Sequence, residues 1–260
     1  MNEVHDAAQR GFEAEAGRYA RGRPEYPDGL LDWLRDDLAL APGRTALDLG
    51  AGTGKFTSLL TRSGATVLAV EPVASMRAEL ARRLPGAQAF EGTAQHMPVP
   101  DGAIDVVICA QAFHWFASEA ALAEIHRVLK PGGRLGLVWN VRDESVDWMA
   151  KVTAIITPHE GDAPRFYKGD WRRPFESADV GRQFSPLQCR VLRYEHVGAP
   201  EEVVLNRFLS VSFIAALDDA RKAEVAASLR ALIDSHPDLR GKQALAAPYR
   251  TEAYWCERRP

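Results

Sequence analysis

The chain has 260 residues, of which 46% are hydrophobic and 26% are charged, and its formal net charge is −3. This balance is typical of a globular protein with a sizeable core, and the small acidic charge provides no long-range attraction to nucleic acid or to an anionic membrane. The three cysteines (Cys109, Cys189 and Cys256) lie far apart and form no CxxC pattern, which argues against a disulfide framework and against a metal site. The polar N-terminus argues against a secretory signal and no apolar run is long enough to span a membrane, so we expect a cytoplasmic protein.

Residues 1–43 are expected to form an N-terminal helical cap. Two turn-like clusters, "RGRPEYPDG" and "LAPGR", enclose a helical pattern in which Leu30, Leu31, Leu34 and Leu38 recur at helical spacing. Asp28 precedes this pattern and is available as its N-cap.

Residues 44–140 alternate between short apolar runs and helical segments. Buried strands are predicted at 45–49, 66–70, 105–110 and 134–139, with a further short strand near 88–90. The segments 55–63, 74–84 and 118–129 have apolar residues three or four positions apart, and the last is capped by Ser118 and stopped by "KPGG". This alternation predicts an α/β fold with a parallel sheet and right-handed crossovers.

Residues 141–260 lose this regularity, and we expect them to elaborate the same single domain, which spans 1–260. A helical pattern at 146–158 precedes a stretch at 161–177 that is rich in Gly, Pro, aromatic residues and arginine. A strand-like alternation at 188–197, helical patterns at 201–216 and 219–234, and a last strand at 251–259 complete the chain.

The most informative stretch is "LDLGAGTGKFT" (47–57), a glycine-rich turn between a predicted strand and a predicted helix. A triphosphate-binding P-loop requires glycine at position 49 and a hydroxyl residue at position 56, where this chain has Leu49 and Phe56. A dinucleotide fingerprint fits Gly50 and Gly52 but finds Lys55 in place of its third glycine. The remaining G-x-G-x-G pattern permits positive φ angles and lets a ligand lie against bare backbone.

Two acidic residues indicate which ligand this is. Asp48, at the end of the first strand, repels phosphate and suits a cationic or ammonium-bearing ligand. Glu71, at the end of the next strand, is placed to accept hydrogen bonds from both hydroxyls of a ribose. S-adenosylmethionine, a nucleoside with a positively charged and phosphate-free tail, fits both.

With these residues in place, the sequence resembles the class I S-adenosylmethionine-dependent methyltransferases of type 11, most closely the small-molecule group that includes trans-aconitate methyltransferase-like enzymes. Segment 47–57 looks like their first motif, 70–72 like their ribose-binding strand end, 91–116 like the adenine-binding turn with the fourth strand, and 124–140 like the fifth strand with its helix and turn. "RPEYP" (23–27) and "YRTEAYW" (249–255) also recur in that group. The resemblance implies a Rossmann-like, seven-stranded, mostly parallel sheet with an antiparallel last strand and helices on both faces.

The resemblance also implies which residues bind the cofactor. Gly50, Ala51 and Gly52 are assigned to the methionine moiety beside Asp48, and Glu71 to the ribose. The adenine is expected among residues of two further turns, namely Pro72, Met76, Thr93, Ala94 and Gln95.

Two more positions complete the implied cofactor site. Gln111 at the end of the fourth strand is expected to line the methionine side, and Tyr19 to fold over the cofactor from the N-terminal segment. Many relatives carry an acidic residue at or beside position 93, or Glu at position 95. Thr93 and Gln95 retain the ability to hydrogen-bond the adenine amino group.

Methyl transfer from a sulfonium is an in-line displacement with an already activated donor, so the protein mainly positions the acceptor and sometimes removes a proton. The stretch "AQAFHWFA" follows the strand at 105–110, where doubly wound sheets place their ligands. His114 is the candidate catalytic residue, as a base or as a polar contact to the acceptor, and Trp115 with Phe116 is a candidate site wall. The alternatives are that His114 only orients the loop or caps a helix, and that the aromatic residues belong to the core.

The segment "RFYKGDWRRPF" (165–175) is the candidate acceptor-binding loop. Arg172 and Arg173 are its candidate acceptor-binding residues, because guanidinium groups bind anions in a bidentate manner. The alternative is a solvated loop whose arginines stack on aromatic rings. Because the whole chain is acidic and contains no visible RNA-binding module, we expect no nucleic acid but a small-molecule acceptor, such as a carboxylate, another anionic compound or a lipid-like compound.

The sequence thus predicts a monomeric or homodimeric enzyme that uses S-adenosylmethionine. A non-catalytic S-adenosylmethionine-binding protein is the alternative outside enzymology. A nicotinamide-dependent oxidoreductase is the alternative enzyme, but the third glycine and a Tyr-x-x-x-Lys pair are both missing from the sequence.

Overall fold

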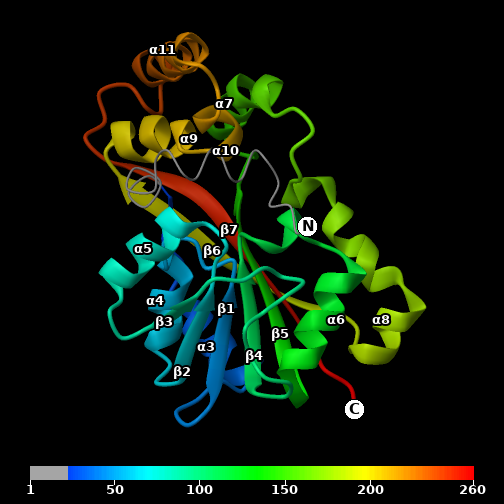
Figure 1. Cartoon of the computed structure of the whole chain (residues 1–260). Helices are drawn as coiled ribbons and strands as arrows, with labels where there is room; N and C mark the ends of the chain where they lie inside the picture. The colour runs from blue at the N-terminus through cyan, green and yellow to red at the C-terminus, as the bar shows by residue number, and fades with distance from the viewer. Residues whose placement is uncertain (1–22) are drawn as a thin grey trace.

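The computed structural model describes residues 23–260, which form a seven-stranded sheet in the order β3-β2-β1-β4-β5-β7-β6 (Figure 1). Neighbouring strands pair in parallel among β1 (Thr45–Leu49), β2 (Thr66–Val70), β3 (Gln88–Phe90), β4 (Ile104–Ala110) and β5 (Leu129–Arg142). β7 (Leu245–Glu257) is inserted between β5 and β6 (Gln188–Gly198) and is antiparallel to both. The predicted seven-stranded sheet with one antiparallel strand, the last in the chain, is therefore confirmed.

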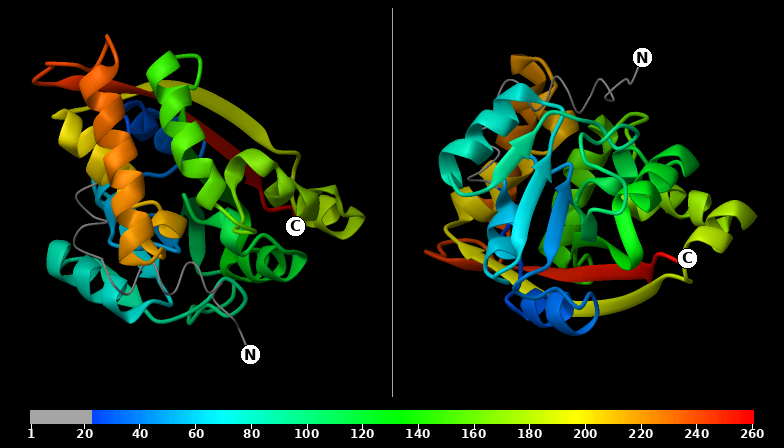
Figure 2. Two further views of the ribbon diagram at one scale, coloured as in Figure 1. Left: turned by 90° about the horizontal axis from the view of Figure 1, so that it is seen from above. Right: turned by 60° about the horizontal axis from the view of Figure 1, so that its bottom comes forward.

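Helices cover both faces of the sheet, as the resemblance implied (Figure 2). On one face, α3 (Gly29–Asp36) and α4 (Lys55–Thr61) bury their apolar side chains against β1, β4 and β5. On the other, α6 (Glu119–Val128) and α8 (Ala178–Gln183) do the same. α5 (Ala74–Arg83) packs beside β3, and its Leu80 lies next to Gly54 at the start of α4.

A single glycine explains how the first face is packed. A Cβ atom on Gly136, in the middle of β5, would lie 2.7 Å from the Trp33 ring of α3 and 2.6 Å from Ile108 of β4. The buried Trp33 ring therefore rests directly on the β5 backbone, because no side chain at position 136 holds it away.

A second helical layer lies beyond the carboxyl ends of the parallel strands, at the top of Figure 1. It contains α7 (Asp147–Ile156), α9 (Arg207–Leu209), α10 (Ser212–Ala215) and α11 (Asp219–Ser235), with a π-helical turn, η5 (Glu201–Asn206), directly before α9. Buried apolar side chains of these elements form one cluster of their own.

β7 connects this helical layer to the sheet. Leu245, Ala247 and Tyr249, in its first half, are buried within the helical cluster, whereas Ala253 and Cys256 are buried in the cores on the two faces of the sheet. Figure 2 shows the long β6 and β7 ribbons running from the helical layer along the whole sheet.

Four short 3₁₀ turns shape the connections that follow β4 and α7. They are η1 (Phe113–Trp115), η2 (Thr157–His159), η3 (Phe166–Lys168) and η4 (Asp170–Glu176). Within residues 23–260, no helix is both long and apolar enough to cross a membrane.

Three local expectations differ from the structure. Asp28 does not cap α3 with its side chain but pairs with Arg62, 2.8 Å away. The helix expected at 201–216 is interrupted: it begins with the π-helical turn and breaks between α9 and α10, where the Ser210 hydroxyl bonds the Arg207 carbonyl at 2.7 Å. "KPGG" (130–133) lies within β5 as a bulge, since Leu129 pairs with Ile104 and the regular register resumes only at position 134.

Candidate cofactor and active site

The glycine turn between β1 and α4 needs glycines for two separate reasons. Gly50, Gly52 and Gly54 have φ angles of 72°, 55° and 82°, in the left-handed region that disfavours side chains. A Cβ atom on Gly50 would also lie 2.8 Å from the Cβ of Ala112, at the end of β4. The turn is fixed to β2, because the Gly50 amide donates to the Val70 carbonyl at 2.8 Å.

This turn forms the floor of a pocket at the carboxyl ends of β1, β2 and β4. The structure places eleven of the twelve sequence-predicted cofactor residues along this pocket, namely Asp48, Gly50, Ala51, Gly52, Glu71, Pro72, Met76, Thr93, Ala94, Gln95 and Gln111. The twelfth, Tyr19, lies outside the described residues.

Asp48 is fully buried beneath the glycine turn. Thr57 of α4 donates a hydrogen bond to its Oδ2 at 2.6 Å, while its Oδ1 is buried without a hydrogen-bond partner in the described part of the chain. Burial, only partly offset by the Thr57 hydrogen bond, raises the pKa of Asp48 to about 7. An unpartnered carboxyl oxygen at the pocket fits a ligand that brings a positive charge or a hydrogen-bond donor.

Glu71 is held in one orientation by the backbone around it. Its two carboxylate oxygens accept hydrogen bonds from the amides of Gly52 and Val73, each at 2.9 Å. Burial raises the pKa of Glu71, and these two amides act in the opposite direction. Each carboxylate oxygen has a second lone pair, so Glu71 can bind the backbone and still accept the hydroxyls of a ribose.

Lys55, the residue that could have suggested phosphate binding, has a different role in the structure. Its ammonium donates to the Arg23 carbonyl at 2.8 Å and pairs with Glu25 at 2.5 Å. It therefore holds the segment "RPEYP" (23–27) against the glycine turn, where the Tyr26 ring meets the Phe56 ring edge-on at 4.9 Å.

Gln111 marks the end of β4 with an uncommon backbone conformation. Its φ angle is 57°, a value that costs a residue with a side chain about 1–3 kcal/mol and that is most often retained at functional sites. Its amide donates to the Val138 carbonyl at 2.8 Å, and its side chain reaches the Asn140 carbonyl at 3.4 Å. Of the residues that follow this turn, Ala112, Trp115 and Phe116 line the pocket.

His114 is half-buried next to this pocket but is not part of its lining. Its Nδ1 accepts a hydrogen bond from the indole Nε1 of Trp139 at 3.1 Å, so a neutral His114 carries its proton on Nε2. Burial first, and then the charges of Arg165 and Arg23, lower the pKa of His114 to about 3. These contacts favour a hydrogen-bond donor at His114 over a general base.

The aromatic run after Gln111 divides between the pocket and the core. Trp115 and Phe116 line the pocket, as expected for a site wall. Phe113 is fully buried and meets Phe116 edge-on at 5.6 Å, so it belongs to the core.

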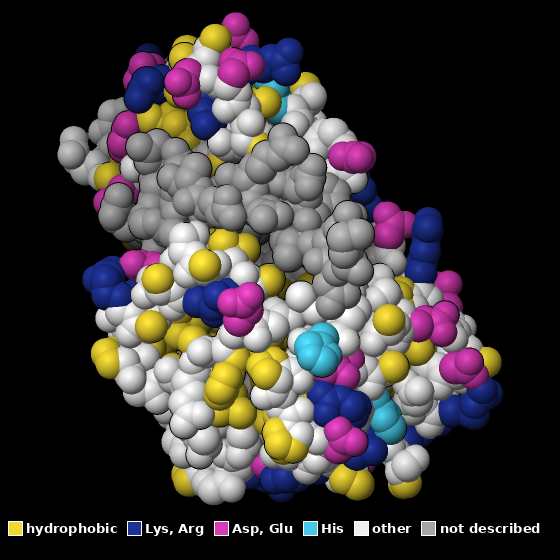
Figure 3. Space-filling model, in the orientation of Figure 1, with side chains coloured by type: hydrophobic (Ala, Val, Ile, Leu, Met, Phe, Trp, Pro, Cys, Tyr) yellow, Lys and Arg dark blue, Asp and Glu magenta, His cyan; other side chains and the backbone are white. Residues whose placement is uncertain are grey.

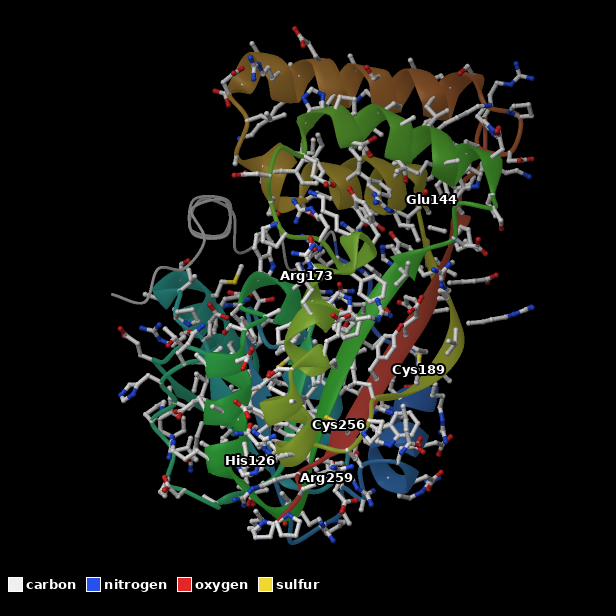
Figure 4. The ribbon with its side chains drawn as sticks, turned by 90° about the vertical axis from the view of Figure 1, so that its right-hand side faces the viewer. His126, Glu144, Arg173, Cys189, Cys256 and Arg259 are labelled. Atoms are coloured by element: carbon white, nitrogen blue, oxygen red, sulfur yellow. The ribbon has the colours of Figure 1, made fainter. Side chains whose placement is uncertain are left out.

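Arg172 and Arg173, the predicted acceptor-binding residues, lie outside the lining of this pocket. Arg172 stacks over Trp171 at 4.2 Å and donates to the Tyr254 hydroxyl at 2.8 Å. Arg173, labelled in Figure 4, is 78% exposed and pairs with Asp170 at 2.8 Å. The alternative interpretation, arginines stacked on aromatic rings or exposed to solvent, describes both residues.

Two other arginines approach the pocket instead: Arg165, which begins the candidate acceptor-binding loop, and Arg207, which the sequence analysis did not single out. Arg207 lines it, and Arg165 lies over the ring of Trp115 at 5.3 Å. The available signal for Arg207 was a charged residue inside the apolar run "VVLNRFL", which is unusual for a buried helical segment. Within residues 23–260, no group of three or more His, Cys, Asp or Glu side chains could hold a metal ion.

Comparison with known proteins agrees with this geometry. A family model described as a methyltransferase domain matches residues 47–137. The methyltransferase-like protein C25B8.10 of Schizosaccharomyces pombe is 36% identical over 252 residues, which cover 96% of each chain. The methyltransferase Rv3342 of Mycobacterium tuberculosis is 36% identical over 240 residues, which cover 92% of each chain.

A solved structure extends the likeness to the fold. Phosphoethanolamine N-methyltransferase 2 of Haemonchus contortus, in complex with S-adenosyl-L-methionine, matches with a TM-score of 0.57 and 14% identity over all of this chain and 60% of that chain. The glycine turn, the buried Glu71 bonded to it and the relatives of nearly equal length lead to one assignment. The trans-aconitate methyltransferase-like subgroup stays a prediction. This chain belongs to the class I S-adenosylmethionine-dependent methyltransferases, and S-adenosylmethionine is its cofactor.

Proposed function

We propose that this enzyme transfers the methyl group of S-adenosylmethionine to a small-molecule acceptor that binds between the cofactor pocket and the C-terminal helical layer. The observation that supports this proposal most directly is that one pocket, at one edge of the sheet, is lined both by the predicted cofactor residues and by the aromatic pair Trp115 and Phe116. On this proposal, residues 44–140 form the cofactor-binding core, and residues 141–260 supply the acceptor side. Basic and acidic side chains are interspersed on the face in Figure 3, which also favours a small molecule over nucleic acid.

The residues of this chain fit a reaction that depends on positioning. S-adenosylmethionine supplies an activated methyl group whose leaving group is neutral. The chain then has to hold the acceptor in line and exclude water, and the apolar faces of Trp115 and Phe116 do both.

His114 contributes a hydrogen bond in this scheme. Its Nδ1 is occupied by Trp139, so the proton on Nε2 is available to donate to an acceptor oxygen. An acceptor that is already deprotonated, such as a carboxylate, needs no base from the protein.

Methyl transfer is tested with S-adenosylmethionine that carries a labelled methyl group and a panel of small carboxylates, phosphate esters, amines and fatty acids. Label transfer to a member of the panel, abolished by Gly50→Val, supports the proposal. Gly50→Val is the matched negative control because its side chain would collide with Ala112 inside the pocket. Tight binding of S-adenosylmethionine without label transfer to any compound would favour the non-catalytic alternative.

A further inference from the structure

Arg207 is a buried cation that has no hydrogen-bond or ion-pair partner among residues 23–260. It is the first residue of α9 and is only 8% exposed. Its Nε and Nη1 are buried and have no hydrogen-bond partner in the described part of the chain, and no ion pair of Arg207 is found there. In the same part of the chain, it is the one residue after position 140 that lines the cofactor pocket.

Such a group is costly for a protein to keep. An arginine cannot release its proton to escape burial, as a lysine or histidine can, and an unpaired buried charge loses its hydration without compensation. The buried cation is explained if an anion enters the pocket and pairs with it.

A second arginine shares the surroundings of Arg207. The guanidinium carbons of Arg142 and Arg207 lie 5.7 Å and 5.3 Å from the centre of the same Phe208 ring. Burial and the charge of Arg207 both lower the pKa of Arg142. Glu144, labelled in Figure 4, is the acidic neighbour of Arg142 and lies 3.8 Å from its Nε.

Arg165 extends the positive charge to the aromatic wall. Its guanidinium carbon lies 4.6 Å from the centre of the Phe213 ring and 5.3 Å from that of Trp115. Its acidic partner, Glu160, is 3.6 Å from its Nε.

Glu160 does not serve Arg165 exclusively, so it neutralises the charge of Arg165 only in part. It also pairs with Lys168 at 3.0 Å and accepts the Tyr167 hydroxyl at 2.5 Å. One carboxylate is thus shared by two cations. Arg142, Arg165 and Arg207, together with Lys168 and the two carboxylates of Glu144 and Glu160, therefore carry a net positive charge.

We propose that Arg207 binds an oxyanion of the methyl acceptor, a carboxylate or a phosphate, through its guanidinium fork, while Arg142 and Arg165 add positive potential. This assignment rests on the proposed methyl transfer and names the chemical class of its acceptor. The carboxylate of the cofactor has a separate candidate partner in Arg23, which lines the pocket beside the glycine turn and whose carbonyl accepts a hydrogen bond from Lys55.

The test uses the full chain saturated with S-adenosylhomocysteine, so that the cofactor site is filled and no transfer takes place. Inorganic phosphate and succinate are titrated separately at constant ionic strength, with calorimetry for affinity and thermal unfolding for stability. The variants are Arg207→Met, which removes the charge, and Arg207→Lys, which keeps the charge and loses the fork. Arg230→Met is the matched control, because this α11 arginine is exposed and only 3.7 Å from Glu201.

We expect at least one of the two anions to bind the wild type and to raise its Tm. Arg207→Met should weaken that binding by about tenfold or more, as expected for loss of a charge-assisted hydrogen bond, and abolish the rise in Tm. Without anion, its Tm should equal or exceed that of the wild type, because an unpaired buried charge has been removed. A residue with a purely structural role would instead lower the Tm when replaced. Arg230→Met should bind the anions like the wild type.

Three results would overturn the assignment. The first is that neither anion binds the wild type, and the second is that Arg207→Met binds both anions as tightly as the wild type does. The third is that Arg207→Met weakens the binding of S-adenosylhomocysteine as strongly as it weakens the binding of the anion. If Arg207→Met does not fold, unchanged anion affinity in Arg207→Lys has the same consequence. Methyl transfer from labelled S-adenosylmethionine separates the two proposals. If methyl transfer is observed but Arg207→Met does not change anion binding, only the anion site is refuted. If anions bind at Arg207 but no compound is methylated, the proposed function is refuted.

Discussion

Because the carboxyl of Asp48 is buried, its ionisation should change the free energy of unfolding of the protein. Burial raises the pKa of Asp48 from 3.8 to about 7 in the folded, ligand-free protein. A group whose folded pKa is raised stabilises the fold fully below its unfolded pKa, and this contribution is lost as the pH rises toward the folded value. The Asp48 carboxyl should therefore destabilise the ligand-free protein progressively between about pH 4 and about pH 7.

The size of the effect follows from the two pKa values. The folded and unfolded pKa values of Asp48 differ by about three units, so its ionisation lowers the free energy of unfolding by about 4 kcal/mol at about pH 8. At about pH 5, which lies between the two pKa values, the loss is only about 2 kcal/mol. Asp48→Asn removes the ionisation but retains the shape. Every pH-independent effect of Asp48→Asn cancels in the difference between the two pH values, which therefore isolates the ionisation, including the stronger hydrogen bond that Thr57 donates to the charged carboxylate.

Urea unfolding without cofactor at about pH 5 and about pH 8 measures this difference. We expect Asp48→Asn to gain about 2 kcal/mol relative to the wild type between the two pH values. Asp101→Asn, an exposed aspartate paired with Arg127, should show no comparable gain. Equal effects of Asp48→Asn at both pH values would refute a raised pKa at this position. Calorimetry should also show that S-adenosylmethionine binds the wild type more tightly as the pH rises, because a cationic ligand prefers the ionised carboxyl.

Three further changes test the pocket. Gly50→Ala should destabilise the fold by about 1–2 kcal/mol and weaken S-adenosylmethionine at least tenfold by calorimetry, because its φ is 72° and its Cβ would lie 2.8 Å from Ala112; unchanged affinity would contradict the turn assignment. Glu71→Ala should weaken the binding of S-adenosylmethionine about tenfold or more and lower the stability of the fold, since two backbone amides lose their acceptor. Replacement of the exposed Glu91 by alanine should change neither quantity. A loss of affinity below twofold would show that Glu71 does not bind the ribose. His114→Asn should retain more methyl transfer than His114→Ala, and kcat should show no acid limb near about pH 6.5; such a limb, lost in His114→Asn, would restore the general base.

The sheet, and the grouping of the predicted cofactor residues along one pocket, were predictable because they depend on local patterns. Short apolar runs bounded by turns predict β1, β2 and β4, and the glycines with Asp48 and Glu71 follow directly from strand ends. Parallel strands bring their carboxyl ends to one edge, so these residues meet once the sheet forms.

The acceptor side was not predictable in the same way. Whether Arg165 or Arg172 faces the pocket depends on rings far away in the sequence: Phe213 lies below Arg165, and Tyr254 bonds Arg172. Arg207 likewise lines the pocket from α9, next to Phe208, which is buried in the cluster of the helical layer. Spacing alone carries no information about such contacts.

The position of β7 also determines when this enzyme can fold. β7 is made last but lies between β5 and β6, and within residues 23–260 it is the only strand that pairs with β6. During synthesis, the edge of β5 therefore stays unpaired until about a hundred further residues have been made, and its backbone N–H and C=O groups are open to pairing with other chains. Premature termination anywhere before residue 245 should yield an aggregating product instead of a smaller working enzyme, and ribosome-bound chains should resist proteolysis only after residue 257 has left the exit tunnel.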